Sequence, residues 1–279
     1  MTDVAQAFVP GHLTGFFTVD PAEDPTKAGS RGAGVTLSAG VTVTVRRADE
    51  QEVVLNGDVV EMEAVTRVLD ALDAPAQVRG VTDLPLGAGF GVSGAMALGT
   101  ALGADAVFER ALSENELVTV AHGAEVQAGT GLGDVVAQAR GGMPIRLEPG
   151  GPHENVVDGV PARPRIEYLS LGEIATDAVV TGDVEELTAA GEGALSRLVA
   201  EPTVREFMHA SRRFSREADL LTDDVRDVIT DVTDAGGQAA MGLLGETVFA
   251  VGDGLSTAGY DPEACRTHPG GATLQDAIE

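Results

Sequence analysis

The stretch PLGAGFGVSGA at residues 85–95 constrains the backbone more than any other part of the chain, because it places four glycines within eleven residues. Glycine adopts left-handed conformations and lets the main chain approach a partner that a Cβ atom would block. The run follows a β-rich stretch (76–83) and precedes an Ala- and Leu-rich stretch (93–112) that is typical of a buried helix. A strand, a glycine-rich loop and a helix are therefore expected in that order. The loop either holds a phosphate group or is a mobile turn.

A dinucleotide site is the first alternative, since GFGVSG at 89–94 matches the G-x-G-x-x-G fingerprint. That fingerprint needs a strand running directly into its first glycine, and an acidic residue ending a second strand about 20 residues on. Here Pro85 and the residues after it interrupt the approach, and the candidates Asp105 and Glu109 fall inside the predicted helix. A nicotinamide enzyme is disfavoured.

A triphosphate explains the loop better, because a helix that begins near Ser93 presents free N–H groups and a positive dipole end to an anion. No lysine follows the glycines, so the loop is not a Walker A motif. The Ser93 hydroxyl can also bind Mg²⁺ on the phosphates, although it can instead be only a helix cap. The predicted nucleotide-binding residues are Pro85, Gly87, Gly89, Gly91, Ser93 and Gly94.

Two carboxylates follow in HGAEVQAGTGLGDVVAQARGG at 122–142. Glu125 shares a helical face with His122, and Asp134 comes after three glycines at the start of the next predicted helix. Carboxylates on either side of a flexible turn can converge on one metal–phosphate site, where one holds Mg²⁺ and the other accepts a proton from a substrate hydroxyl. The alternatives are a solvated helix face for Glu125 and a helix cap for Asp134.

Charge excludes several partners. The chain has 44 acidic and 18 basic residues, a net charge of -26, and Lys27 as its only lysine. Acid spread along the whole chain indicates a surface adapted to molar salt (halophilic), with an ordinary acidic protein as the alternative. Nucleic acid and anionic membrane are poor partners, because no basic stripe is present.

Localisation is predicted to be cytoplasmic. The sequence has no apolar run of about 18 residues and no signal peptide at its N-terminus. The single cysteine, Cys265, is typical of a reducing compartment.

The pattern of elements predicts an α+β protein with two unequal lobes. Strands are expected at 34–47, 52–60 (a hairpin turning at Asn56-Gly57), 76–83, 142–149, 165–171 and 238–252. Helices are expected at 61–72, 93–112, 113–128 (with a capping box from Ser113 to Glu116), 132–140, 183–200, 203–221 and 223–234. The Gly- and Pro-rich stretch 150–164 is the candidate linker between domains at 1–160 and 161–279.

Four segments together resemble the motifs of the GHMP kinases: VPGHLTGFF (9–17), PLGAGFGVSGA (85–95), GTGLGDVVAQARGG (129–142) and MGLLGETVFAVG (241–252). AFVPGHLTGFF, GSRGAGVTLSAGV and GFGVSGAMALGTALG further resemble the archaeal pantoate kinases, which phosphorylate pantoate on the route to coenzyme A. The resemblance implies an N-terminal domain like the second domain of ribosomal protein S5, beginning with a strand and a turn around Pro10-Gly11. It also implies a ferredoxin-like C-terminal domain, with ATP and Mg²⁺ in the cleft between the two.

The resemblance also implies roles for individual residues. Ser93 and Glu125 match the family's Mg²⁺ ligands, and Asp134 matches its catalytic aspartate. The chain departs from the family pattern in four places: Phe90 replaces the usual leucine of the loop, Val92 replaces a serine, His12 stands where mevalonate kinase-like members carry lysine, and the third motif lacks Gly-Ser-Gly-Pro.

A pocket for pantoate needs a cation for the carboxylate. Arg146 is the candidate, because its planar guanidinium suits a partner with two oxygens; the alternative is an ion pair with Glu148. His122, His12 and Ser30 are further substrate-binding candidates, each of which can equally be a satisfied structural group. Another GHMP kinase of the homoserine or mevalonate type, and a non-catalytic regulator, remain alternatives. A homodimer is also left open.

Overall fold

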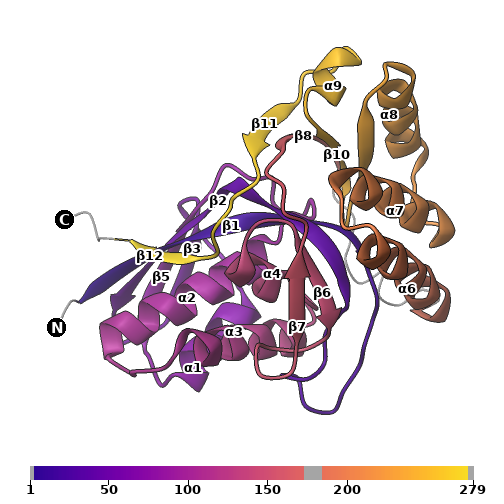
Figure 1. Ribbon diagram of the computed structural model, residues 1–279. Coiled ribbons are helices and arrows are strands. Elements are labelled where there is room, and N and C mark those ends of the chain that lie inside the picture. Colours follow the sequence, from indigo (N-terminus) through magenta and orange to yellow (C-terminus); the bar gives the residue numbers. More distant parts are fainter. Residues whose placement is uncertain (1–2, 173–183, 276–279) are drawn as a thin grey trace.

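The computed structural model describes residues 3–172 and 184–275, which form two β-sheets with helices packed against them (Figure 1). The first sheet runs in the order β12 (Thr273–Gln275), β1 (Val4–Phe17), β2 (Gly32–Arg47), β5 (Ala76–Val81), β3 (Glu52–Leu55) and β4 (Asp58–Val59). β6 (Pro144–Glu148) pairs with β2, and β7 (Val156–Gly159) pairs with β6. The second sheet runs in the order β11 (Glu263–Arg266), β8 (Arg165–Gly172), β10 (Glu246–Val251) and β9 (Gln238–Gly242).

The helices fall into two groups along the chain. In the first half of the chain these are α1 (Glu63–Ala71), α2 (Val92–Phe108), α3 (Glu114–Ala128) and α4 (Asp134–Arg140). In the second half they are α6 (Val184–Ala200), α7 (Val204–Glu217), α8 (Asp223–Asp234) and the short α9 (Gly254–Thr257). α2 packs on β1 and β2, whereas α7 and α8 pack on β9 (Figure 1). α6 and α7 of the second group also contact β1 of the first sheet.

β1 and β2 form the longest antiparallel pair, from Val4 opposite Arg46 to Phe17 opposite Gly32. The expected turn at Pro10-Gly11 is wrong. β1 continues through these residues, and only a shift of register marks them. A side chain at Gly11 would meet Leu84 Cδ1 at 2.6 Å, and the next residue, His12, donates its backbone N–H to the Phe90 carbonyl at 3.0 Å. β1 therefore lies directly beneath the glycine loop.

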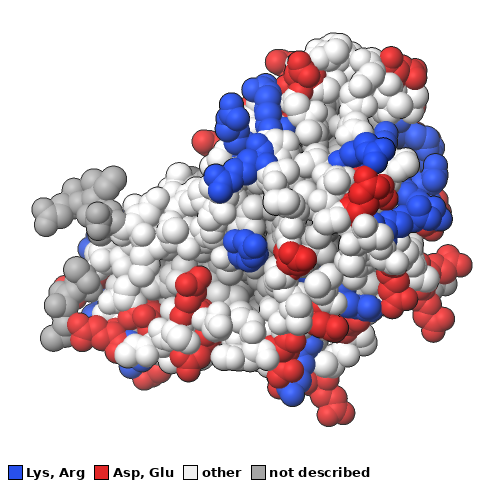
Figure 2. Space-filling view, viewed as in Figure 1, with Lys and Arg blue, Asp and Glu red and all other residues white. Residues whose placement is uncertain are grey.

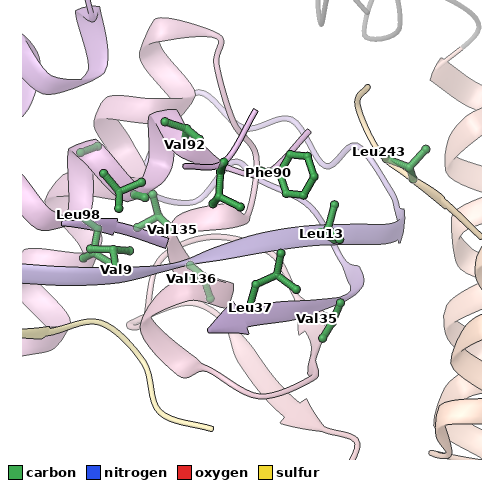
Figure 3. Close-up of a cluster of buried hydrophobic side chains, with 14 of the residues drawn as sticks. Val9, Leu13, Val35, Leu37, Phe90, Val92, Leu98, Val135, Val136 and Leu243 are labelled. Carbon is green, nitrogen blue, oxygen red and sulfur yellow. The ribbon is translucent and has the colours of Figure 1, made fainter. Parts of the chain in front are cut away.

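α2 is buried on all sides, so glycines let it lie close to the sheet. A Cβ at Gly99 would meet Val43 Cγ2 at 2.5 Å, and one at Gly103 would meet Val45 Cγ2 at 2.6 Å. At the start of the helix, Phe90 and Val92 join the core with Leu13 and Leu243 (Figure 3). The core thus runs from the helix across β1 to the loop that precedes β10.

Most predicted elements are confirmed, including the Asn56-Gly57 hairpin between β3 and β4 and the capping box that begins α3. Two helices are shorter than predicted: α2 ends at Phe108, before a left-handed Glu109, and α7 ends at Glu217. The candidate linker is wrong in part, because 156–159 is strand β7, hydrogen-bonded to β6. β11 and β12 were not predicted, and β12 returns to pair with β1 in the first sheet.

Replacing Gly99 by alanine should destabilise the fold by about 1–3 kcal/mol, because the added methyl overpacks the contact between α2 and Val43. Chemical denaturation in molar KCl measures the change. The matched control is Gly193→Ala at an exposed position of α6, where an added Cβ meets nothing within 4 Å. That variant should gain about 0.5–1 kcal/mol from helix propensity. Equal stability of the two variants would contradict this packing.

Candidate functional site

The glycine loop takes the conformation that its sequence requires. Gly87, Gly89 and Gly91 have φ of 71°, 83° and 65°, in the left-handed region. A Cβ at Gly89 would lie 2.9 Å from the backbone nitrogen of Leu244. Gly91 occupies the N-cap position of α2 with no side chain capping it, so the first N–H groups of the helix have no side-chain acceptor there. The alternative in which Ser93 caps the helix is wrong.

The Ser93 hydroxyl instead donates a hydrogen bond to Glu125 Oε1 at 2.5 Å, and Thr130 donates to the same oxygen at 2.8 Å. Glu125 is buried, with 2% of its surface exposed, so the alternative of a solvated helix face is wrong. Burial raises the pKa of Glu125 to about 7, against the lowering effect of its two hydrogen bonds. A nearby cation would favour the ionised carboxylate here.

Asp134 is the first residue of α4, and Gly133 holds the N-cap position, so the capping alternative for Asp134 is also wrong. Its Oδ1 lies 2.7 Å from Nδ1 of His12, and 27% of its side chain is exposed. Burial pushes the pKa of Asp134 upward, but the hydrogen bond from His12 and the charge of Arg146 outweigh it and leave the pKa below its usual value. The side chain of Asp134 is therefore ionised at neutral pH.

His12 is fully buried on β1, and burial lowers its pKa despite the neighbouring carboxylate. A neutral ring beside an ionised Asp134 carries its proton on Nδ1, which donates to that carboxylate. Nε2 has no hydrogen-bond partner among the described residues. His12 therefore fixes one oxygen of Asp134 and leaves Oδ2 available.

Arg146 on β6 is 3% exposed and carries a guanidinium that is only partly satisfied. Its Nε donates to the Ser30 carbonyl at 3.2 Å and its Nη2 to the Ser30 hydroxyl at 3.1 Å, while Nη1 has no partner among the described residues. No ion pair joins Arg146 to Glu148 in the described part of the chain, so that alternative is wrong. A buried guanidinium with a free nitrogen calls for an anion.

These side chains surround one cavity of about 370 Å³. Ten of the twelve predicted site residues line it: Ser30, Pro85, Gly87, Gly89, Gly91, Ser93, Gly94, Glu125, Asp134 and Arg146. Sequence reasoning missed other wall residues, among them Thr14, Phe17, Thr130, Leu132, Leu243 and Leu244. Of these, Leu243 and Leu244 lie in the segment 241–252, and its resemblance to a family motif is the sequence signal that points to them.

The two histidines do not line the cavity. His12 lies behind Asp134, as described above. His122 is 1% exposed, and its Nε2 donates to the Ala28 carbonyl at 2.8 Å. The prediction that His12 and His122 line the substrate site is therefore wrong. Each histidine instead supports a residue or segment that forms the cavity wall.

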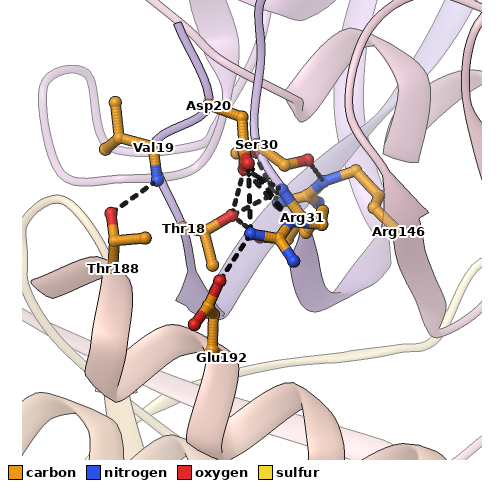
Figure 4. Close-up of polar contacts among 8 residues, drawn as sticks. All are labelled: Thr18, Val19, Asp20, Ser30, Arg31, Arg146, Thr188 and Glu192. Atoms are coloured by element: carbon orange, nitrogen blue, oxygen red, sulfur yellow. Dashed lines mark hydrogen bonds and ion pairs between the residues drawn. The ribbon is translucent and has the colours of Figure 1, made fainter.

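The segment that carries Ser30 is tied to α6 by a polar network (Figure 4). Arg31 donates to Glu192 at 2.9 Å and pairs with Asp20 at 3.1 Å, and the Val19 N–H donates to the Thr188 hydroxyl at 3.2 Å. Hydrogen bonding to Glu192 raises the pKa of Arg31. Helix α6 therefore braces the strand ends that hold Ser30 against Arg146.

Comparisons with known proteins agree with this arrangement. Residues 59–142 match the family described as the GHMP kinases N terminal domain. The chain is 33% identical to a pantoate kinase of Thermococcus kodakarensis over 88% of this chain and 87% of that one. It is 32% identical to a pantoate kinase of Methanocaldococcus jannaschii, over 88% and 91% of the two chains. The chain belongs to the pantoate kinase branch of the GHMP kinases.

Solved structures agree as well. A phosphotransferase related to the CoA biosynthesis pathway superposes with a TM-score of 0.87 at 29% identity, covering 98% of both chains. A homoserine kinase from Cytophaga hutchinsonii, at 17% identity and a TM-score of 0.70, covers 99% of this chain and 98% of that one and shares the fold. The predicted α+β GHMP kinase fold is confirmed. No helix in the described residues has the length and apolar character to cross a membrane.

Proposed function

We propose that this GHMP kinase is a pantoate kinase, which transfers the γ-phosphoryl group of ATP to the primary hydroxyl of pantoate and forms 4-phosphopantoate for coenzyme A biosynthesis. The named relatives support this substrate. The observation that carries it is the buried Arg146, which has no partner for Nη1 among the described residues and lines the same cavity as the ionised Asp134. A cation and a base in one small cavity suit a hydroxy acid.

Asp134 acts as the base in this proposal. Its Oδ1 is held by His12, so Oδ2 is the oxygen that accepts the hydroxyl proton. The N–H groups of the loop and of the first turn of α2 point at the transferring phosphates and stabilise the charge that develops there. Arg146 holds the pantoate carboxylate and keeps the hydroxyl near Asp134.

Magnesium is part of the same proposal. Ser93 and Glu125 would hold the ion, and the donor set suits it, because Mg²⁺ commonly takes one or two carboxylates and completes its shell with phosphate oxygens and water. No three His, Cys, Asp or Glu side chains among the described residues converge as a metal site, so the proposal depends on Ser93, Glu125 and the phosphates. The bound ion would neutralise phosphate charge.

We further propose that the protein is a salt-adapted cytoplasmic enzyme. Its domains would span 1–160 and 161–279, and its assembly would be a homodimer.

Release of ADP from Mg²⁺-ATP in molar KCl tests the function. D-pantoate should be turned over, whereas homoserine, mevalonate and pantothenate should give the rate of the reaction without substrate. Turnover of another alcohol alone would assign a different GHMP kinase. Folded protein that binds ATP and turns over none of them would be a regulator.

Replacing Arg146 by glutamine should raise the KM for pantoate by about 10–100-fold, because a charge-assisted bond to the carboxylate is lost. The control is Arg79→Gln at an exposed position of β5, which should leave KM unchanged. An unchanged KM in the Arg146 variant would remove the arginine from the substrate site.

Replacing Asp134 by asparagine should lower kcat by about 10²–10⁴-fold while the fold is retained, because an amide accepts no proton. Steady-state kinetics and circular dichroism measure the two effects. Asp224→Asn on the exposed surface of α8 is the control. Turnover like that of the wild type would eliminate Asp134 as the base.

His12 should act as a positioning residue. His12→Leu removes the hydrogen bond that helps to lower the pKa of Asp134, so the acidic limb of the kcat–pH profile should move to higher pH while KM changes less than kcat. His12→Asn keeps a donor near the Nδ1 position and should restore much of the rate. If Leu and Asn variants share one profile, His12 serves only packing.

A further inference from the structure

A second hollow lies on the outer face of α6 and α7, and we call it the arginine hollow. It has a volume of about 430 Å³ and is lined by Arg197, Arg212, Arg213 and Arg216, together with Glu206 and His209. It shares no lining residue with the candidate active site. Figure 2 shows the blue side chains that gather over this part of the molecule.

The arginine hollow is positively charged, although the chain as a whole is strongly acidic. The whole sequence carries 44 acidic and only 18 basic residues, yet the hollow wall holds four guanidiniums and one carboxylate. Like charges held close together repel, and that cost falls when an anion sits between them. Acidic side chains abound elsewhere in the sequence, so a shortage of partners does not explain the cluster.

Two of the four guanidiniums have no partner within the part of the chain that the structure describes. Arg213 pairs with Glu217 at 2.6 Å, and Arg212 Nη1 lies 3.4 Å from the Thr233 hydroxyl. Neither Arg197 nor Arg216 makes a side-chain hydrogen bond or an ion pair with any described residue. The hollow therefore presents two exposed guanidiniums, one on α6 and one on α7, that no described side chain pairs.

The spacing places these donors on one side of α7. His209 and Arg213 are four residues apart, as are Arg212 and Arg216, so the two pairs lie on neighbouring lines along the helix and all four line the hollow. Arg197 stands in the last turn of α6, the helix that packs beside α7. Guanidiniums bind phosphate with two parallel hydrogen bonds.

We propose that the arginine hollow binds a compact polyanion carrying phosphate groups, at a site separate from the catalytic cavity. Its volume is in the range of small-molecule sites. An extended nucleic acid would meet acid beyond the hollow, since Glu201 and Glu217 flank it and the chain is acidic as a whole.

Calorimetric titration with inorganic pyrophosphate tests the site. Saturating ADP is present so that the glycine loop is occupied, and the KCl concentration is the lowest at which the protein stays folded. The wild type should bind one pyrophosphate per chain, and affinity should fall as KCl rises. Absence of binding would overturn the proposal. Citrate binding more tightly than pyrophosphate would overturn the phosphate assignment.

Two double variants separate the hollow from general charge. Arg197→Ala with Arg216→Ala should weaken pyrophosphate binding by about tenfold or more for each guanidinium removed. Arg205→Ala with Arg226→Ala removes the same charge from exposed arginines outside the hollow wall and should change affinity by less than about twofold. Equal weakening in the two variants would overturn the site.

A single change guards against loss of the fold. Arg216 is exposed, so Arg216→Gln should leave the circular dichroism spectrum unchanged and still weaken pyrophosphate binding by about tenfold. Retained affinity in this folded variant would likewise overturn the proposal.

Discussion

The site depends on how closely helix α4 lies against the glycine loop. Gln138 on α4 donates from Nε2 to the Gly91 carbonyl at 2.8 Å, and a Cβ at Gly91 or Gly94 would come within 3.0 Å of the Gln138 amide. Because Gln138 is one turn beyond Asp134 on the same helix, this contact also sets where the aspartate stands. Side chains on the loop would push α4 away and separate the base from the phosphate site.

Burial raises the pKa of both carboxylates in this cavity, and the neighbouring groups of each carboxylate oppose that effect to a different extent. Glu125 is left to the dominant effect of burial, which raises its pKa to about 7, whereas His12 and Arg146 together keep Asp134 ionised. Two carboxylates in one cavity thus have different protonation behaviour because their neighbours differ. That division matches the roles proposed for them, a metal ligand that gains from a cation and a base that is ionised beforehand.

Local signals were sufficient to predict the parts of the fold that depend on neighbours in sequence. The glycines at 87–91, the Asn56-Gly57 turn and the Ser113 capping box each have a local physical cause, and each was found. β7 was missed because it lies in a Gly- and Pro-rich stretch that resembles a linker. Its strand conformation depends on hydrogen bonds to β6, which the local sequence does not show. β12 was missed because its three residues are exposed and show no apolar alternation.

The direction of a side chain is harder to predict than its position. His122 and Glu125 share a helical face at a spacing of three, but one bonds the Ala28 carbonyl and the other the Ser93 hydroxyl. The bond between His12 and Asp134 joins residues 122 positions apart, which no local pattern contains. Arg146 lines the cavity, as its choice for a two-oxygen partner requires, and its contact with substrate stays a prediction.

Helix α6 connects the two arginine-bearing regions of the molecule. One part of it, with Thr188 and Glu192, bonds the segment that carries Ser30, and its last turn brings Arg197 to the arginine hollow. Gly191, which lies between Thr188 and Glu192 in the sequence, is so close to β1 that a Cβ there would meet the Phe17 carbonyl oxygen at 2.2 Å. With that face fixed against β1, α6 has little freedom to shift on its own.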